Sequence, residues 1–259
     1  LHLLAIAYEA DVDLDIFEFG KVSMSVPHMV PMIPAGQYTL LDFYEAGGIP
    51  VMMKELATIL DLNGITCTGC TSKENIEKFQ NKNPDVIRSF KNPVHSRGGI
   101  AVLKGNVAPD GAVTKPSAIP ESTLLFRGPA KIYESEQDAL SGIRAKQVHG
   151  GEVVVIRNEG PKGGPGMPEM YKVMKVLVGM NLGSKVCVIT DGRFSGSNNG
   201  CFVGHICPEA LDDGPIAYLQ DGDVITVDVL NGTIEAEVDF DLRRKEKTRK
   251  EVEPVKGCL

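Results

Sequence analysis

Short apolar runs, each followed by a loop rich in glycine and polar residues, constrain the fold of this chain most. Residues 153–156 precede the segment EGPKGGPGMPEM at 159–170, and residues 186–189 precede TDGRFSGSNNG at 190–200. Apolar runs of four residues bounded by glycine and proline are typical of buried strands. Similar runs occur at 100–103, 124–126, 224–229 and 233–240. They predict an α+β or barrel-like region from residue 91 onward.

Asn231-Gly232 gives the clearest local signal, because this dipeptide favours the tight turn of a β-hairpin. In the run that follows it, apolar side chains alternate with acidic ones, so the apolar set should share one face of a strand. The members of that set are Ile234, Ala236, Val238 and Phe240.

Two helices are expected between the strands. Ser135 is a good N-cap for a helix over 135–146, and Pro168 suits the first turn of a helix over 168–180. The basic stretch 243–250 is expected to be a solvated helix face.

The first part of the chain differs from the rest. Residues 1–90 are expected to be mostly helical, with an amphipathic helix from about Pro50. The polar, proline-containing segment 81–93 marks a boundary, so we expect two parts, 1–90 and 91–259. Because the chain opens inside an apolar helical pattern without a capping residue, we expect it to be a piece of a longer protein.

Composition narrows the possible classes of function. The 259 residues carry 27 Lys and Arg against 34 Asp and Glu, a formal charge of −7. An acidic chain with scattered basic residues argues against nucleic-acid or anionic-membrane binding. No apolar run approaches the roughly 18 residues of a membrane span. The 6 cysteines are too sparse for a disulfide scaffold, so a reducing, cytoplasmic location is expected.

The glycine-rich loops are the best candidates for a site, since glycine lets the backbone approach a ligand closely. Loop 159–170 is not a Walker phosphate loop, because no Gly-Lys-Ser/Thr follows its glycines. It leads into the predicted helix start at Pro168, where free N–H groups attract anions. Glu169 in that turn either complements the helix dipole or serves as a ligand for Mg²⁺.

Loop 190–200 holds two more candidates. Arg193 either holds a substrate carboxylate or makes a surface ion pair. The residues alone favour a turn-stabilising role for the Ser195 hydroxyl. Ser195 is not the nucleophile of a Gly-x-Ser-x-Gly elbow, because Arg193 and Ser197 occupy the glycine positions.

A redox or zinc site formed by cysteines is a weaker hypothesis than a site in the glycine-rich loops. Cys67 and Cys70 have the CxxC spacing of a redox pair or half a zinc site, but the chain has no second pair at that spacing. Cys187 lies in an apolar run and is expected to pack in the core. His205 lies near two further cysteines and is expected to be a satisfied structural histidine.

Four long motifs carry a family resemblance: GGIAVLKGNVAPDGAVTK (98–115), EGPKGGPGMPEM (159–170), ITDGRFSG (189–196) and GHICPEA (204–210). HLLAIAYEA (2–10) and EAGGIPVMMKEL (45–56) are weaker matches. Together they resemble the dihydroxy-acid and 6-phosphogluconate dehydratase family from end to end. The GPKGGPGMPEM form is more similar to the dihydroxy-acid enzymes, although sugar-acid dehydratases share much of the pattern.

The resemblance implies an architecture. Family members are roughly twice as long, so this chain resembles their C-terminal half. Residues 91–259 would form a swivelling β/β/α barrel-like domain, after a mostly helical tail of an α/β N-terminal domain. The resemblance places the iron–sulfur ligands and most carboxylates around Mg²⁺ in the N-terminal half, and none of the cysteines here falls in those ligand motifs. A homodimer is expected on the same ground.

The resemblance also implies a reaction, in which a 2,3-dihydroxy acid loses water to give a 2-keto acid, as in branched-chain amino-acid biosynthesis. Ser195 would be the base, Glu169 the Mg²⁺ ligand, and Lys162 and Arg193 would hold the substrate carboxylate. The fragment alone would be inactive, because the cluster could not assemble on it. The alternatives are a hydro-lyase for sugar acids and a non-catalytic module that binds small acids.

Overall fold

The computed structural model describes residues 2–33, 36–194 and 200–246. They divide into two compact units. Val22–Gly99 form the smaller unit, and the residues up to Lys21 together with those from Ile100 onward form the larger one. The glycine-rich loops predicted to carry a site belong to the larger unit.

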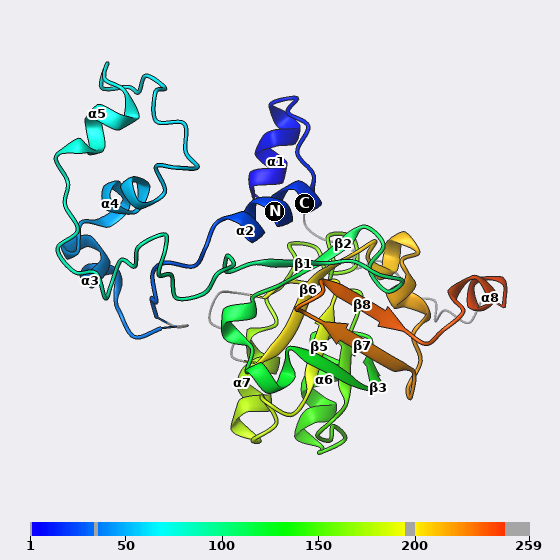
Figure 1. The fold of residues 1–259 in the computed structure, drawn as a ribbon. Helices are drawn as coiled ribbons and strands as arrows, with labels where there is room; N and C mark the ends of the chain where they lie inside the picture. The colour runs from blue at the N-terminus through cyan, green and yellow to red at the C-terminus, as the bar shows by residue number, and fades with distance from the viewer. Residues whose placement is uncertain (1, 34–35, 195–199, 247–259) are drawn as a thin grey trace. The chain divides into compact units, whose positions relative to one another are not determined.

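The larger unit is built on a sheet of eight strands in the order β1-β2-β6-β5-β4-β3-β7-β8 (Figure 1). The strands β6, β5, β4 and β3 run parallel, and antiparallel strands flank them on both sides. Their bounds are β1 Ala101–Leu103, β2 Gly111–Thr114, β3 Leu125–Tyr133, β4 Val153–Ile156, β5 Cys187–Thr190, β6 Cys201–Cys207, β7 Val224–Asp228 and β8 Thr233–Ala236.

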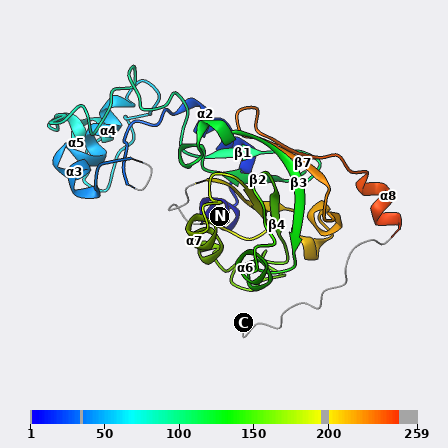
Figure 2. The same ribbon diagram turned by 90° about the horizontal axis from the view of Figure 1, so that it is seen from below.

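The sheet nearly closes into a barrel, because its two edge strands meet. The backbone N–H of Lys104, just after β1, donates to the Gly232 carbonyl at 2.9 Å, and the Ile234 N–H of β8 donates to the Lys104 carbonyl at 3.1 Å. The curvature that brings these edges together can be followed in Figure 2. The expectation of a mixed, barrel-like fold is confirmed.

Apolar side chains cover both faces of the central strands. In β4, Val153 and Val155 lie in the barrel core, while Val154 and Ile156 pack with α6 and α7. These two helices, α6 (Glu136–Arg144) and α7 (Tyr171–Gly179), lie side by side against the outside of the sheet (Figures 1 and 2). Because both faces of this strand are buried, successive side chains are all apolar, which explains the uninterrupted run VVVI.

The capping chemistry of α6 is as predicted, whereas α7 differs. The Ser135 hydroxyl accepts the Asp138 N–H at 3.1 Å. The prediction that Pro168 opens the next helix is wrong, because α7 begins three residues later at Tyr171. Glu169 instead forms a parallel β-bridge with Arg193 of the next loop, and Met170 is the N-cap of α7.

The C-terminal hairpin confirms the Asn231-Gly232 signal, with β7 and β8 paired antiparallel around it. The predicted alternation continues past β8, since Phe240 is buried, but Phe240 belongs to α8 (Phe240–Lys245) and not to the strand. The expectation of a solvated helix face is wrong for Arg243. Its guanidinium donates to Asp223 at 2.7 Å, and both side chains are largely buried.

The smaller unit contains α3 (Leu40–Glu45), α4 (Gly48–Glu55) and α5 (Ser72–Glu77) around a small apolar core. The helix expected from about Pro50 therefore exists. Reciprocal capping boxes start α3 at Thr39 and α5 at Thr71. The remaining helices are α1 His2–Glu9, α2 Ile16–Ser25 and the short 3₁₀ segments η1 Pro116–Ala118, η2 Glu121–Thr123, η3 Ala210–Asp212 and η4 Pro215–Tyr218.

A membrane-crossing helix is not found: within residues 2–246, apart from the two gaps, none is long and apolar enough.

The closed sheet predicts that Gly105→Ala lowers the stability of the folded protein. A Cβ atom at Gly105 would lie 1.9 Å from the Ile234 carbonyl oxygen, so the seam between β1 and β8 must shift. We expect the free energy of unfolding to fall by about 1–3 kcal/mol, measured by urea denaturation. Gly179→Ala, where a Cβ meets nothing within 4 Å, is the control and should be neutral or slightly stabilising. Equal stability of the two variants would contradict the role of the seam.

Candidate functional site

The carboxyl ends of the four parallel strands meet at one edge of the sheet. Each strand is followed within three residues by an acidic residue: Glu134 after β3, Glu159 after β4, Asp191 after β5 and Glu209 after β6. In parallel sheets this is the edge where ligands bind. The sequence motifs contained Glu159, Asp191 and Glu209 but not Glu134, and the roles of these acids were not predicted.

Asp191 fastens two loops to the end of β5. Its side chain is buried, and its carboxylate accepts the backbone N–H groups of Glu159 at 2.9 Å, Ala210 at 2.9 Å and Asn158 at 3.1 Å. Burial raises the pKa of this carboxyl, although the three N–H groups oppose the effect. The loops after β4 and β6 therefore take their positions from one buried side chain.

Glu209 holds the glycine-rich turn in the same way. Its carboxylate accepts the N–H of Lys162 at 2.8 Å and of Gly163 at 2.9 Å. A Cβ at Gly160 would lie 2.6 Å from the Glu209 carboxylate, and one at Gly163 would lie 2.6 Å from the Asn158 backbone. Glycine is needed at both positions because the turn packs directly against its anchors.

The side chains of Glu159 and Arg157 complete this framework. The Glu159 carboxylate accepts the Glu136 N–H at the start of α6 at 2.6 Å, and burial raises the pKa of Glu159. Arg157 donates to both carboxylate oxygens of Glu134, at 2.7 and 2.9 Å. Its Nη1 also donates to the Ala217 carbonyl at 2.8 Å. Arg157 is thus a structural residue that ties the end of β4 to η4.

The loops that carry the GMPEM and GRFSG motifs are joined to each other. Glu169 and Arg193 form an isolated parallel bridge, and the Met170 N–H donates to the Arg193 carbonyl at 3.1 Å. The Arg193 Nε donates to the Met167 carbonyl at 2.7 Å, which uses one of its five N–H groups. The structure therefore brings together Glu169 and Arg193, which are 24 positions apart in the sequence.

The side chain of Glu169 is exposed, and its carboxylate has no hydrogen bond or ion pair with the rest of the described chain. Because α7 starts at Tyr171, the interpretation of Glu169 as a first-turn carboxylate that complements a helix dipole is wrong. Glu169 instead presents a carboxylate that no other described residue engages, at the carboxyl edge of the sheet.

The other predicted site residues are placed as follows. Lys162 is exposed, and its ammonium group pairs with Asp212, which raises the lysine pKa. Ser195 lies outside the described residues, two positions after Arg193 in the sequence.

The cysteines form no metal site in the described part of the chain, where no group of three or more His, Cys, Asp or Glu side chains could hold a metal ion. Cys67 and Cys70 are exposed in the smaller unit, on a turn in which the Thr66 N–H donates to the Cys70 carbonyl at 2.9 Å. Core packing of Cys187 is confirmed: it is fully buried, 3.0 Å from the Cys201 sulfur. Burial raises the pKa of the Cys187 thiol.

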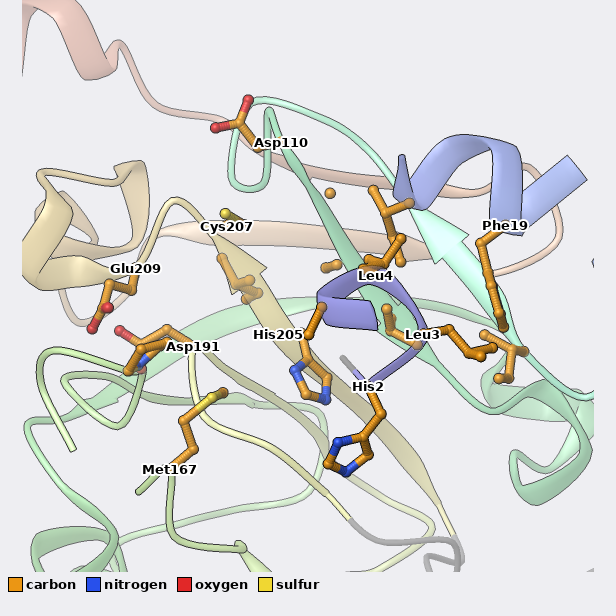
Figure 3. A pocket seen from close by; sticks show the side chains of 18 of the residues that line it. His2, Leu3, Leu4, Phe19, Asp110, Met167, Asp191, His205, Cys207 and Glu209 are labelled. Atoms are coloured by element: carbon orange, nitrogen blue, oxygen red, sulfur yellow. The ribbon is translucent and has the colours of Figure 1, made fainter. Parts of the chain in front are cut away.

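A cavity of about 810 Å³ opens beside the paired loops (Figure 3). Met167 and Asp191 line it from the loop side, and His205 and Cys207 line it from β6. His205 was expected to be a satisfied structural histidine. Instead, its ring forms no hydrogen bond within the described part of the chain, and its φ is +57°. Burial lowers the pKa of His205 to about 4, and the charge of Arg193 adds to the effect.

Comparison with known proteins gives one consistent result. The family model described as dihydroxy-acid/6-phosphogluconate dehydratase C-terminal matches residues 85–259, and the corresponding N-terminal model matches residues 1–75.

Two relatives illustrate the similarity. A dihydroxy-acid dehydratase of Acetivibrio thermocellus is 45% identical over an alignment of 264 residues, which covers 100% of this chain and 48% of that protein. One from Sulfolobus acidocaldarius is 47% identical over 251 residues, covering 95% and 44%. The chain spans about half the length of the curated relatives it matches.

The anchoring role of Asp191 predicts that Asp191→Asn is destabilising. An amide retains one oxygen, so at least one of the three buried N–H groups would face an NH₂ group and lose its acceptor. We expect the free energy of unfolding to fall by about 2 kcal/mol, measured by urea denaturation. Asp13→Asn, at an exposed aspartate, is the control and should leave stability unchanged. Matching curves for the two variants would show that the carboxylate is not an anchor.

The low pKa of His205 predicts a pH effect on stability. As the pH falls below the ordinary value of 6.5, the unfolded chain gains a proton at this histidine, but the folded chain does not until about pH 4. Stability is therefore lost over that interval, by at most about 3 kcal/mol. His205→Asn should show a smaller loss when urea unfolding is compared at pH 7 and pH 4.5. Parallel losses in the two proteins would contradict the buried, neutral imidazole.

Proposed function

Because this chain belongs to the dihydroxy-acid/6-phosphogluconate dehydratase family, we propose that it is the C-terminal portion of an enzyme that converts 2,3-dihydroxy carboxylic acids to 2-keto acids. The observation that carries the proposal is the pairing of the GMPEM and GRFSG loops through Glu169 and Arg193. That pairing gathers the candidate metal ligand and carboxylate-binding group at the carboxyl edge of the sheet. The names of the similar proteins favour the dihydroxy-acid branch. A role in branched-chain amino-acid biosynthesis is proposed from the family resemblance alone.

Glu169 fits the role of a Mg²⁺ ligand. Its carboxylate is exposed and has no partner among the described residues, and Mg²⁺ prefers such oxygen donors. Since the described chain has no cluster of three candidate ligands, Glu169 would be one ligand and the rest would come from elsewhere in the protein. We place the ligands of the iron–sulfur cluster outside this chain, as the family resemblance implies, and no group of three or more candidate metal ligands forms among the described residues.

The proposed reaction removes a proton from C2 and hydroxide from C3, and the resulting enol becomes the 2-keto acid. Bound Mg²⁺ and the cluster would supply Lewis-acid stabilisation for the developing enolate and the departing oxygen. Ser195 would take the C2 proton on its oxygen. A neutral serine is a very weak base, so its hydroxyl must first lose its own proton in a strongly cationic environment.

Arg193 and Lys162 are proposed to bind the substrate carboxylate. Arg193 has N–H groups left beyond the one that it gives to Met167. Lys162 already pairs with Asp212 on an exposed surface, so binding substrate would require it to exchange one carboxylate for another.

For the whole protein, we propose a tail of an α/β N-terminal domain over 1–90 and a swivelling β/β/α domain over 91–259. We also propose a cytoplasmic homodimer, on family membership alone. The 259-residue chain by itself should be inactive, because the cluster ligands lie outside it. Turnover by the purified chain would contradict that part of the proposal.

The decisive test is an anaerobic assay of the full-length protein with 2,3-dihydroxyisovalerate. Ser195→Ala should lower kcat by about 10²–10⁴-fold at unchanged iron content, because the proton acceptor is lost. Glu169→Gln should lower the magnesium content, measured by elemental analysis, together with activity. Ser141→Ala, on the exposed face of α6, is the serine control and should retain activity.

Other outcomes would change the assignment. Turnover of sugar acids in place of the branched-chain acid would move the protein to the sugar-acid branch. Binding of small acids without turnover by an iron-loaded protein would favour a non-catalytic module. Full activity of Ser195→Ala would remove Ser195 as the base.

A further inference from the structure

The cavity beside the paired loops has a distinct chemical character. On one side α1 and α2 line it with His2 and with apolar side chains that include Leu3, Leu4 and Phe19 (Figure 3). The charged residues among those that line it are all acidic, and no Lys or Arg is among the described lining residues. The acids are Asp110, Asp191, Glu209 and Asp212.

This charge pattern decides which acids the cavity can accommodate. A phosphate group at the far end of a substrate would enter a space lined by carboxylates and by no described Lys or Arg, which is electrostatically unfavourable. An uncharged alkyl chain would bury apolar surface against α1 and α2 instead, which is favourable. The cavity therefore fits an acid that carries its only negative charge at the end held by the loops.

Two histidines line the cavity, His2 from α1 and His205 from β6, and His205 is the one tied to the GRFSG loop. Its backbone N–H donates to the Gly192 carbonyl at 2.8 Å, directly before Arg193, so its position is tied to the GRFSG loop. Its left-handed backbone, with φ of +57°, carries strain that a core histidine does not need. The ring faces the cavity beside α1 (Figure 3), and its low pKa keeps it uncharged at neutral pH. A neutral imidazole both donates and accepts hydrogen bonds, as a substrate hydroxyl requires.

We propose that this cavity is the subsite for the uncharged alkyl end of the substrate acid, and that His205 contacts a hydroxyl group of that acid. The inference rests on the proposed function for the identity of the acid. It goes beyond that function by excluding acids phosphorylated at the far end and by naming a substrate-contacting residue outside the GMPEM and GRFSG motifs. Met167 connects the two regions, since it lines the cavity and its carbonyl accepts the Arg193 Nε–H.

The first experiment measures binding by calorimetry in the full-length protein. The probes are 2,3-dihydroxyisovalerate, its homologue with one more methylene group, and 6-phosphogluconate. Ala5→Phe fills the cavity from an exposed position of α1. It should weaken binding of the longer acid about tenfold more than that of the shorter one, because a hydrophobic site discriminates about that strongly per methylene. Ala10→Phe, at an exposed alanine outside the cavity lining, is the matched control and should change neither affinity.

The second experiment tests His205 separately. His205→Asn keeps a residue that tolerates the left-handed backbone but shortens the polar side chain. We expect affinity for both dihydroxy acids to fall by about tenfold, the loss expected for one hydrogen bond, with the ratio between them unchanged. Lys146→Asn is the control, because Lys146 has a similar φ of +59° at an exposed site.

The outcomes separate the subsite from the reaction, because binding and turnover are measured independently. If Ala5→Phe and His205→Asn both weaken binding but the protein shows no turnover, the proposed subsite is supported and the proposed dehydratase function is overturned. If the protein turns over the acid but neither variant changes its affinity, the proposed subsite is overturned and the proposed dehydratase function stands. Binding of 6-phosphogluconate as tight as that of the dihydroxy acids overturns the charge argument, and no binding of any acid overturns both proposals.

Discussion

The candidate site depends on one buried carboxylate that accepts three backbone N–H groups. Asp191 sits at the end of β5, and its oxygens fix the first residues of the loop after β4 and the start of η3. Glu209, which follows β6, then holds the glycine-rich turn at Lys162 and Gly163. Because each anchor stands at the end of a strand in the same parallel set, the rigidity of the sheet passes directly to the loops.

The barrel gives these anchors their fixed positions. The central strands are buried on both faces, by the barrel core on one side and by α6 and α7 on the other. The seam at Lys104 joins the outer edges, so the sheet cannot open without breaking backbone hydrogen bonds. The loops can therefore be irregular and glycine-rich, while the carboxyl edge that carries them stays in place.

Much of this arrangement was predictable from local sequence patterns. The apolar runs, the Ser135 cap and the Asn231-Gly232 hairpin are local signals, and the structure contains each of the corresponding elements. The start of α7 was not predictable, because Pro168 suits a first helical turn and the bridge between Glu169 and the distant Arg193 is not a local signal. The roles of Asp191 and Glu209 also depend on which strands become neighbours. For Asp191 the available signal was an acid soon after the apolar run 186–189, whereas the strand before Glu209, β6, was itself not predicted.

The anchors have a consequence for how such a site can diverge. Asp191 and Glu209 bind backbone N–H groups and not side chains, so most loop residues can be exchanged without loss of these bonds. The exceptions are glycines such as Gly160 and Gly163, where added atoms would collide with the framework. A lineage could therefore alter its preferred acid through the side chains around the cavity while inheriting the loop scaffold unchanged.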